Sequence, residues 1–331
     1  MAEQRTGRIT GTGSCVPDLC ITNERLSEVV DTSDAWIYSR TGIHRRRIAA
    51  DETVADLAAE AAKSAMEKAK ILPEEIDLLL VATCSGEMLF PGTACQVQAR
   101  IGAVRAAAFD MNAACSGFLF ALGTAWAYLK SGLYEKILVI GAEKLSRLLD
   151  WGDRSTCVLF GDGAGAVVLE ADGKGIMGMV QHADGNKGQV LTCPEGHETA
   201  GSSNPFLRKT ERIPNISSLE MEGQEVFKFA VKQVPRCIEE VLAQTGTAKE
   251  EIRYYILHQA NSRILSGAAK RLQEPEGKFP MNMEEYGNTS AASIPLLLDE
   301  LNREGKLQRG DKLVLSGFGA GLTWGALLLE W

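Results

Sequence analysis

The 331-residue sequence has few of the features that mark a metalloprotein or a secreted protein. It contains only four histidines, and its eight cysteines include no Cys-x-x-Cys pair, so we expect no metal site. The first ten residues, MAEQRTGRIT, lack the apolar segment of a secretory signal. We therefore expect a cytoplasmic protein whose cysteines are reduced thiols.

Positive charge is not in excess either. The 35 Lys and Arg residues are outnumbered by 43 Asp and Glu residues, which gives a net charge of −8. Binding to nucleic acid depends on clustered positive charge, so we expect no nucleic-acid partner.

Long hydrophobic runs are scarce, and the longest uncharged one is interrupted by small and polar residues. Residues 111–129 carry no formal charge, but Asn112, Ser116 and Gly117 are among the residues that break the run. A membrane-spanning helix needs about 20 predominantly apolar residues. The run therefore indicates a buried central helix rather than a membrane helix, with Cys115 near its beginning.

Short apolar runs alternate with helical patterns along the chain, which is typical of α/β proteins. The runs predicted as buried strands are residues 76–82, 137–141, 166–170, 254–258, 312–316 and 325–330. The segments predicted as helices are residues 54–70, 116–130, 224–244, 262–272 and 291–302.

The two halves of the chain repeat this order with nearly equal spacing. From the middle of the first strand to Cys115 is 35 residues, and from the equivalent later strand to Ser290 is 34. The next strand ends 26 residues after Cys115 and 27 residues after Ser290. We predict two copies of one α/β unit, spanning residues 1–175 and 176–331.

Two segments need separate interpretation. Residues 184–221 show little periodicity, so they form either a functional loop or a tolerated surface insertion. The run FGDGAGA, residues 160–166, imitates a nucleotide-binding glycine pattern but lies between the apolar runs CVLF and AVVLE. That order predicts a strand, a turn and a strand, whereas a dinucleotide site needs a helix after the turn.

Cys115 is the leading candidate for a reactive group. Unpaired N–H groups at a helix N-terminus favour negative charge and lower the pKa of a thiol. We therefore expect a thiolate at neutral pH without a dedicated base, and Ala114 and Gly117 leave room for a substrate carbonyl. The alternative is a structural cysteine in the core.

Two further residues make an acyl-transfer set with Cys115. His258 ends an apolar run, where α/β sheets present functional groups, and Asn288 lies in a glycine-flanked turn. An asparagine can only exchange hydrogen bonds, so we expect His258 and Asn288 to hold a thioester oxygen as charge builds on it. In the turn SGFGAGL, the N–H of Gly319 is predicted to form an oxyanion hole with that of Cys115.

The motifs NAACSGF, HQAN, YGNTSAAS, FGDGAGA and FGAGLTWG together resemble those of β-ketoacyl-[acyl-carrier-protein] synthase III. The resemblance runs from TSDAWIYSRTGIHRR to the C-terminal TWGALLLEW. It implies a thiolase-like fold, in which two duplicated α/β halves form five layers in the order αβαβα.

The resemblance also implies an activity. A starter acyl group passes from coenzyme A to Cys115 and is then joined, by decarboxylative Claisen condensation, to malonyl-acyl-carrier protein, which initiates type II fatty acid synthesis. His258 and Asn288 would stabilise the enolate formed as carbon dioxide leaves. The coenzyme A thioester is a substrate, and no resident cofactor is implied.

Three surfaces follow from the same resemblance. Phe90 would reach across a homodimer and close the partner's acyl pocket. Trp36 and Arg154 would lie on the two faces of the adenine of coenzyme A. Other matches to the coenzyme A tunnel are Thr32, Arg40, Gly223, Phe227 and Asn261. The basic candidates for carrier-protein docking are Lys228, Arg263, Lys270 and Arg271. The alternative for these basic residues is a solvated helix face.

The chain departs from the family where Gly319-Ala320-Gly321-Leu322 replaces the common GGGF, which leaves the starter acyl group open. A related condensing enzyme of secondary metabolism and a non-catalytic acyl-CoA-binding protein are the alternatives. A degradative thiolase is disfavoured, because Phe318 begins the turn in which that enzyme would carry a second cysteine.

Overall fold

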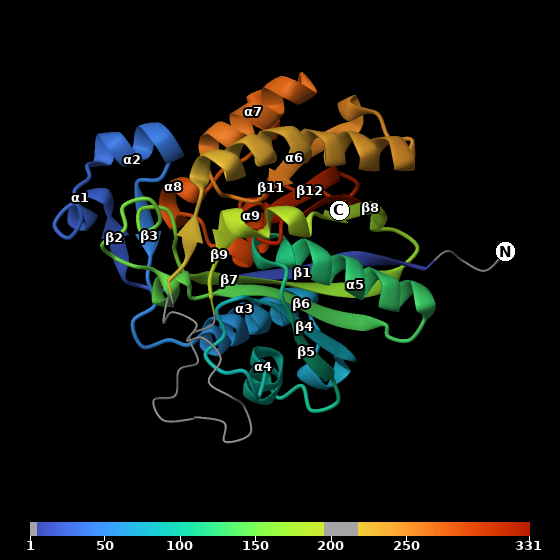
Figure 1. Ribbon diagram of the computed structural model, residues 1–331. Helices are drawn as coiled ribbons and strands as arrows, with labels where there is room; N and C mark the ends of the chain where they lie inside the picture. Colours follow the sequence, from blue (N-terminus) through green and yellow to red (C-terminus); the bar gives the residue numbers. More distant parts are fainter. Residues whose placement is uncertain (1–4, 195–217) are drawn as a thin grey trace, which may run out of the picture.

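The computed structural model describes residues 5–194 and 218–331, which form two main β-sheets (Figure 1). The first sheet has the order β1-β7-β6-β4-β5, in which β4 runs parallel to β5 and β6 while β7 runs antiparallel to β6 and β1. Its strands are β1 (Thr6–Cys15), β4 (Leu78–Ala82), β5 (Ala107–Met111), β6 (Lys136–Glu143) and β7 (Gly163–Asp172).

The second sheet repeats this pattern without an equivalent of β5. Its order is β11-β12-β13-β8, with β11 parallel to β12 and the other two pairs antiparallel. Its strands are β8 (Ile176–Ala183), β11 (Ile252–Leu257), β12 (Lys312–Gly319) and β13 (Thr323–Glu330).

Helices separate and cover the two sheets in five layers, which confirms the predicted αβαβα architecture (Figure 1). Helices α3 and α4 pack on the outer face of the first sheet, α5 and α9 lie between the sheets, and α6 and α7 cover the second sheet. The longer helices are α2 (Asp34–Thr41), α3 (Val54–Ala69), α4 (Thr93–Ile101), α5 (Gly117–Ser131), α6 (Gly223–Thr245), α7 (Ser262–Leu272) and α9 (Ser293–Arg303). The shorter elements are β2 (Cys20–Thr22), α1 (Asn23–Leu26), β3 (Arg45–Arg47), β9 (Leu191–Thr192), β10 (Glu220–Met221) and α8 (Met283–Tyr286).

The uncharged run of the sequence forms α5, the central helix. Phe118, Leu119 and Leu122 have no exposed surface, because sheets lie on both sides of this helix. Within the two described ranges, no helix combines the length and the hydrophobicity needed to cross a bilayer.

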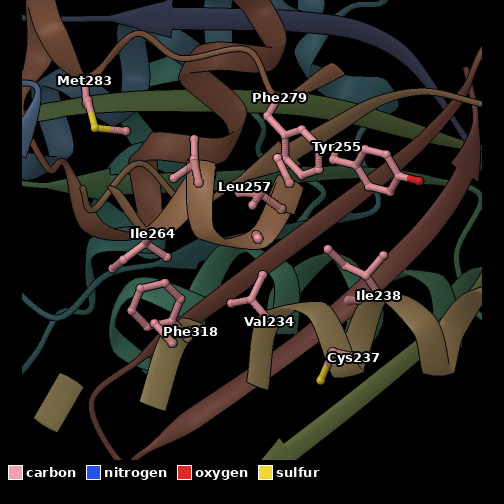
Figure 2. Packing of buried hydrophobic residues seen from close by; sticks show 14 of the residues in the cluster. Val234, Cys237, Ile238, Tyr255, Leu257, Ile264, Phe279, Met283 and Phe318 are labelled. Atoms are coloured by element: carbon pink, nitrogen blue, oxygen red, sulfur yellow. The ribbon is translucent and has the colours of Figure 1, made fainter. Parts of the chain in front are cut away.

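The outer layer of the second half is held by an apolar core between α6, α7 and the second sheet (Figure 2). Val234 and Ile238 of α6 meet Leu257 of β11, while the rings of Tyr255 and Phe279 stack at a centroid distance of 4.7 Å. Phe318 belongs to the same core and lies next to the turn that follows β12, so this packing fixes that turn in place.

The predicted strands and helices are all present, with ends shifted by a few residues. One local prediction is wrong: residues 157–160 (CVLF) form a turn rather than a strand. Phe160 makes only an isolated parallel bridge to Asn288, and that bridge ties the Asn288 turn to the first half. Of segment 184–221, residues 195–217 lie outside the described structure, so its role stays a prediction.

Candidate active site

Cys115 lies in a 3₁₀ turn, Ala114–Ser116, directly before α5, as its sequence position predicted. Ala114 has a φ of 45°, a left-handed conformation that is unusual for a residue with a side chain. Gly319 of β12 lies against this turn so closely that a Cβ there would be 2.7 Å from the Cys115 nitrogen. Only glycine fits at this contact, which brings the two predicted oxyanion-hole residues together.

The protonation state of Cys115 differs from the sequence prediction. Burial raises the pKa of this thiol to about 12, and the nearby carboxylate of Glu143 acts in the same direction. The position before α5 is therefore not sufficient to make a thiolate at neutral pH. Burial favours the protonated thiol, although the neighbouring Ser290 side chain lowers its pKa, and the thiol must lose its proton when it reacts.

His258 follows β11 directly and is buried next to the Cys115 turn. Its backbone N–H donates to the Ser316 carbonyl at 2.9 Å, and its ring meets Phe318 edge-on at 5.3 Å. Because Phe318 immediately precedes Gly319, β12 connects His258 to Cys115. Burial lowers the pKa of His258 to about 3, so the imidazole is neutral at physiological pH.

Asn288 is buried in the turn before α9, and its backbone pairs with Leu159 and Gly161. Its side-chain Oδ1 accepts a hydrogen bond from the Ser290 N–H at 2.9 Å. This contact orients the amide and leaves the NH₂ end as the group that can donate. The Ser290 turn packs directly on the Cys115 turn, so the structure brings all three predicted residues into one region.

A cavity of about 570 Å³ opens at Cys115. Cys84, Cys115, Ser290 and Ala320 line it near the thiol, and apolar side chains such as Leu148 line it further away. His258 and Asn288 are not part of this lining. Of the two departures from the family turn, Ala320 lines the cavity, whereas Leu322 is buried in the hydrophobic core.

The predicted coenzyme A residues gather near the exposed end of α2. The guanidinium groups of Arg40 and Arg154 lie 4.6 and 4.9 Å from the centre of the Trp36 ring. Asn261 caps α7 and donates to the Arg40 carbonyl at 2.9 Å. The hydroxyl oxygen of Thr32 is buried without a hydrogen-bond partner among the described residues.

The remaining tunnel and docking candidates lie on α6 and α7. Gly223 begins α6, and the Phe227 ring one turn later lies 5.7 Å from the Arg263 guanidinium. Arg271 donates to the Val231 carbonyl at 3.0 Å. Lys228 pairs with Glu225, and Lys270 is exposed. All four basic residues lie on α6 or α7, and these two helices pack against each other.

Comparisons with known proteins agree with this geometry. The family model for the C-terminal part of 3-oxoacyl-[acyl-carrier-protein] synthase III matches residues 242–331, and a second model of that synthase matches residues 109–185. The β-ketoacyl-[acyl-carrier-protein] synthase III of Clostridium acetobutylicum is 50% identical over 98% of both chains. The chain belongs to the β-ketoacyl-[acyl-carrier-protein] synthase III family.

Other members support the assignment. The synthase III of Caldanaerobacter subterraneus subsp. tengcongensis is 47% identical over 100% of this chain and 99% of its own. The crystal structure of the synthase III from Aquifex aeolicus superposes with a TM-score of 0.91 and 45% identity, covering 98% of this chain and 100% of that one. The predicted family, fold and acyltransferase class are thereby confirmed.

Phe90 behaves differently from the other synthase III candidates. Its side chain is 83% exposed, together with its neighbours Met88 and Leu89, and it does not line the cavity of its own chain. Strand β5 beside it is a sheet edge with mostly exposed residues. A large aromatic side chain left in solvent next to an unpaired strand edge is unusual unless another surface covers it.

Several residues of the site were not found from the sequence. Ser293 lies 2.7 Å from His258 Nδ1, and Glu143 is buried below Cys115 and receives a hydrogen bond from Ser290. Both are ordinary residues at element ends, and their roles depend on contacts between segments more than 30 residues apart. The only available signal was the position of Glu143 two residues after the predicted strand 137–141.

One group of ligand-type side chains lies outside the site. His182, Cys237 and Glu240 have potential ligand atoms within 4.8 Å of one another. His182 Nε2 and Glu240 Oε2 already pair at 2.9 Å, and burial raises the pKa of Cys237 to about 12. A metal ion here would have to displace the ion pair and ionise a buried thiol, so the arrangement is explained by packing.

Proposed function

We propose that this synthase III starts fatty acid synthesis by moving an acyl group from coenzyme A to Cys115 and condensing it with malonyl-acyl-carrier protein. The observation that carries the proposal is the close contact between Gly319 and the Cys115 turn, which supports an oxyanion hole formed by the backbone N–H groups of these two residues. In the first step, the sulfur attacks the thioester carbonyl, the negative oxygen is held by these N–H groups, and coenzyme A leaves.

The second step uses His258 and Asn288 as hydrogen-bond donors. Malonyl-carrier protein loses carbon dioxide, and the thioester oxygen of the resulting enolate accepts hydrogen bonds from His258 Nε2–H and the Asn288 NH₂. A neutral imidazole can fill this role, because its single N–H is a hydrogen-bond donor when the other ring nitrogen acts as the acceptor. The enolate carbon then attacks the acyl group on Cys115.

Coenzyme A would enter beside α2. Trp36 offers a flat surface for adenine, and Arg154 would move from the face of that ring to the other side of the base. The buried Thr32 hydroxyl has no hydrogen-bond partner among the residues that the structure describes, and the ligand could supply one. The exposed basic side chains of α6 and α7, led by Arg263, would receive the acidic carrier protein.

We further propose a homodimer built on the β5 edge, in which Phe90 enters the cavity of the partner. The exposed side chains Met88, Leu89 and Phe90 support this arrangement. The two halves, residues 1–175 and 176–331, would act as one unit, because Cys115 comes from one half and His258 and Asn288 from the other. We place the protein in the cytoplasm, where both substrates are made.

Separate assays of the two half-reactions test this proposal. Acylation is followed as mass added to the protein, and decarboxylation as carbon dioxide released from malonyl-carrier protein. His258→Ala and Asn288→Ala should still become acylated but should release carbon dioxide at least ~100-fold more slowly. The role of these two residues is wrong if either variant decarboxylates at the normal rate.

A further inference from the structure

Glu143, the last residue of β6, is a fully buried carboxylate that the mechanism above does not use. Five groups donate hydrogen bonds to it, and they come from the loop after β4 and from the Ser290 turn. These donors are the hydroxyls of Thr83, Ser85 and Ser290, together with the thiol and the backbone N–H of Cys84. Burial raises the pKa of this carboxyl group, whereas the hydrogen bonds from Ser85, Cys84 and Ser290 favour its ionised form.

The two oxygens of Glu143 have different surroundings. Oε2 accepts from Ser85 Oγ at 2.5 Å and from Thr83 Oγ1 at 3.2 Å. Ser85 Oγ also accepts the Lys144 N–H, and Thr83 Oγ1 also accepts the Ser85 N–H, so each hydroxyl keeps its own proton to donate to Oε2. Oε1 instead faces Ser290 Oγ at 3.0 Å and the Cys84 thiol at 3.3 Å. Oε1 is therefore the oxygen that can take up a proton.

Ser290 lies between this oxygen and the reactive thiol. Its hydroxyl donates to Glu143 Oε1 at 3.0 Å, and its side chain lines the cavity beside Cys115, on a turn that packs against the Cys115 turn. Its backbone has a φ of 49°, a conformation that costs free energy for a residue with a side chain and that is commonest at functional sites. The left-handed turn thus places one hydroxyl beside both Cys115 and Glu143.

No ion pair reaches Glu143 within residues 5–194 and 218–331. The nearest basic side chains have other partners: Lys144 Nζ donates to the carbonyls of Ala50 and Glu52, and Arg147 donates to those of Ser85 and Gly86. The other titratable neighbours are the thiols of Cys84 and Cys115. Among the described residues, the ionised form of Glu143 is therefore surrounded by neutral donors, and the pKa raised by burial makes this carboxylate a stronger proton acceptor.

We infer that Ser290 and Glu143 form a proton relay for Cys115. As the Cys115 sulfur forms its bond to the acyl carbon, the thiol proton moves to Ser290 Oγ and the Ser290 proton moves to Glu143 Oε1. The bond between the acyl carbon and the coenzyme A sulfur breaks, and the departing thiolate takes a proton from solvent. This inference rests on the proposed function, since it assumes that Cys115 is the acylated residue.

The relay returns the proton after condensation. When the enolate carbon attacks the acyl group, the bond from the acyl carbon to Cys115 breaks and leaves a thiolate. Glu143 then gives its proton to Ser290, and Ser290 gives its own to Cys115. Glu143, Ser290 and Cys115 are thereby returned to their starting protonation states. Over one cycle, one proton is taken from solvent, and it ends on the thiol of coenzyme A.

A purely electrostatic role for Glu143 predicts the opposite result. The Glu143 charge raises the pKa of Cys115, so its removal alone would make the thiolate easier to form. Glu143→Gln would then react faster at pH 7 than the unchanged protein. Under the relay, the same variant reacts more slowly, because the acceptor of the thiol proton is lost.

The test measures the rate of Cys115 modification from pH 6 to pH 10 with acetyl-CoA, and separately with iodoacetamide, by mass of the peptide that contains Cys115. With either reagent, Glu143→Gln should be at least ~100-fold slower at pH 7, the usual scale of a lost general base. Its rate should rise about tenfold per pH unit as hydroxide replaces the carboxylate. The unchanged protein should show a flat profile above the pKa of Glu143.

Asp162→Asn is the matched control. Asp162 is also a buried carboxylate with a serine hydroxyl and backbone N–H donors, but it does not line the Cys115 cavity. The pH dependence of Cys115 modification in Asp162→Asn should have the same shape as in the unchanged protein. Ser290→Ala should reproduce the slow, pH-dependent reaction of Glu143→Gln, so that the relay can be tested even where one variant fails to fold.

The possible failures are distinguishable. A Glu143→Gln rate equal to or above normal at pH 7, or a uniform loss at every pH, would overturn the relay. Failure of acetyl-CoA to modify the unchanged protein would instead overturn the proposed function. The iodoacetamide profile would still decide the relay in that case, because alkylation needs no coenzyme A site.

Discussion

The hydroxyl of Ser293 lies 2.7 Å from Nδ1 of His258, and both side chains are buried. The Gln259 N–H points at the same hydroxyl oxygen from 3.3 Å. When the serine proton is donated to His258 Nδ1, the imidazole proton lies on Nε2, the atom proposed to face the substrate. In that arrangement Ser293 selects the tautomer in which His258 Nε2 is a donor.

This relationship predicts the effect of Ser293→Ala. Without the serine proton, His258 can hold its own proton on Nδ1 and lose its donor end, so decarboxylation should slow by ~10–100-fold while acylation of Cys115 stays normal. Carbon dioxide release and protein mass report the two steps. Ser131→Ala, at the exposed end of α5, is the control. Equal losses in both steps would contradict a role for Ser293 in the tautomer.

The buried His258 also predicts a pH dependence of stability. Its pKa is about 3 in the folded protein and near 6.5 when exposed, so below pH 6.5 only the unfolded chain takes up the proton. The free energy of unfolding should therefore fall as the pH drops from 6.5 towards 3. Urea unfolding of His258→Gln should show a shallower decline over this range. Parallel curves for the two proteins would show that His258 is not buried in its neutral form.

Gly319 and Gly317 provide a matched pair on β12. A Cβ on Gly319 would be 2.7 Å from the Cys115 nitrogen, whereas one on Gly317 would meet its neighbours at 3.5 Å or more. Gly319→Ala should displace the Cys115 turn and slow acylation at least ~100-fold, as expected for a disrupted oxyanion hole. The acylation rate of Gly317→Ala should stay within about threefold of normal, because a Cβ at that position would make only ordinary van der Waals contacts. Similar rates for the two variants would refute the oxyanion-hole assignment.

Much of the fold could be predicted because its strands are continuous apolar runs. Strand β1 was missed, since TGRITGTGSC has too few apolar residues to indicate a buried strand. The structure explains this composition: Cβ atoms on Gly11 and Gly13 would lie 2.2 Å from carbonyl oxygens of α3. Close approach of the alanine-rich helix, rather than side-chain burial, buries this strand.

The site was predictable in its reactive residues but not in their protonation. Cys115, His258 and Asn288 lie in distinctive motifs, and the structure brings them together. The raised pKa of Cys115 and the relay residues depend on burial and on contacts between the two halves. The position of Cys115 at a helix N-terminus takes no account of burial. Here the effect of burial, which raises the pKa of the thiol, is larger than the effect of the helix N-terminus, which lowers it.

Trp36 and Trp126 test the proposed coenzyme A surface. Each ring carries a cationic side chain at 4.6 Å, but Trp126 lies on α5, away from α2. Trp36→Ala should raise the KM for acetyl-CoA by about tenfold, the scale of a lost stacking contact, with little change in kcat. Trp126→Ala should leave KM unchanged. A shift of KM in both variants would point to general destabilisation instead.

The most direct test of the central claim is the intact mass of the protein after incubation with acetyl-, isobutyryl- and longer acyl-CoAs, beside Cys115→Ala. The account predicts a gain of one acyl group, which the variant loses and which malonyl-carrier protein removes as β-ketoacyl product. The relative gains would also rank the starter groups. No covalent gain with any acyl-CoA would contradict the account and favour a protein that binds acyl-CoA without reacting.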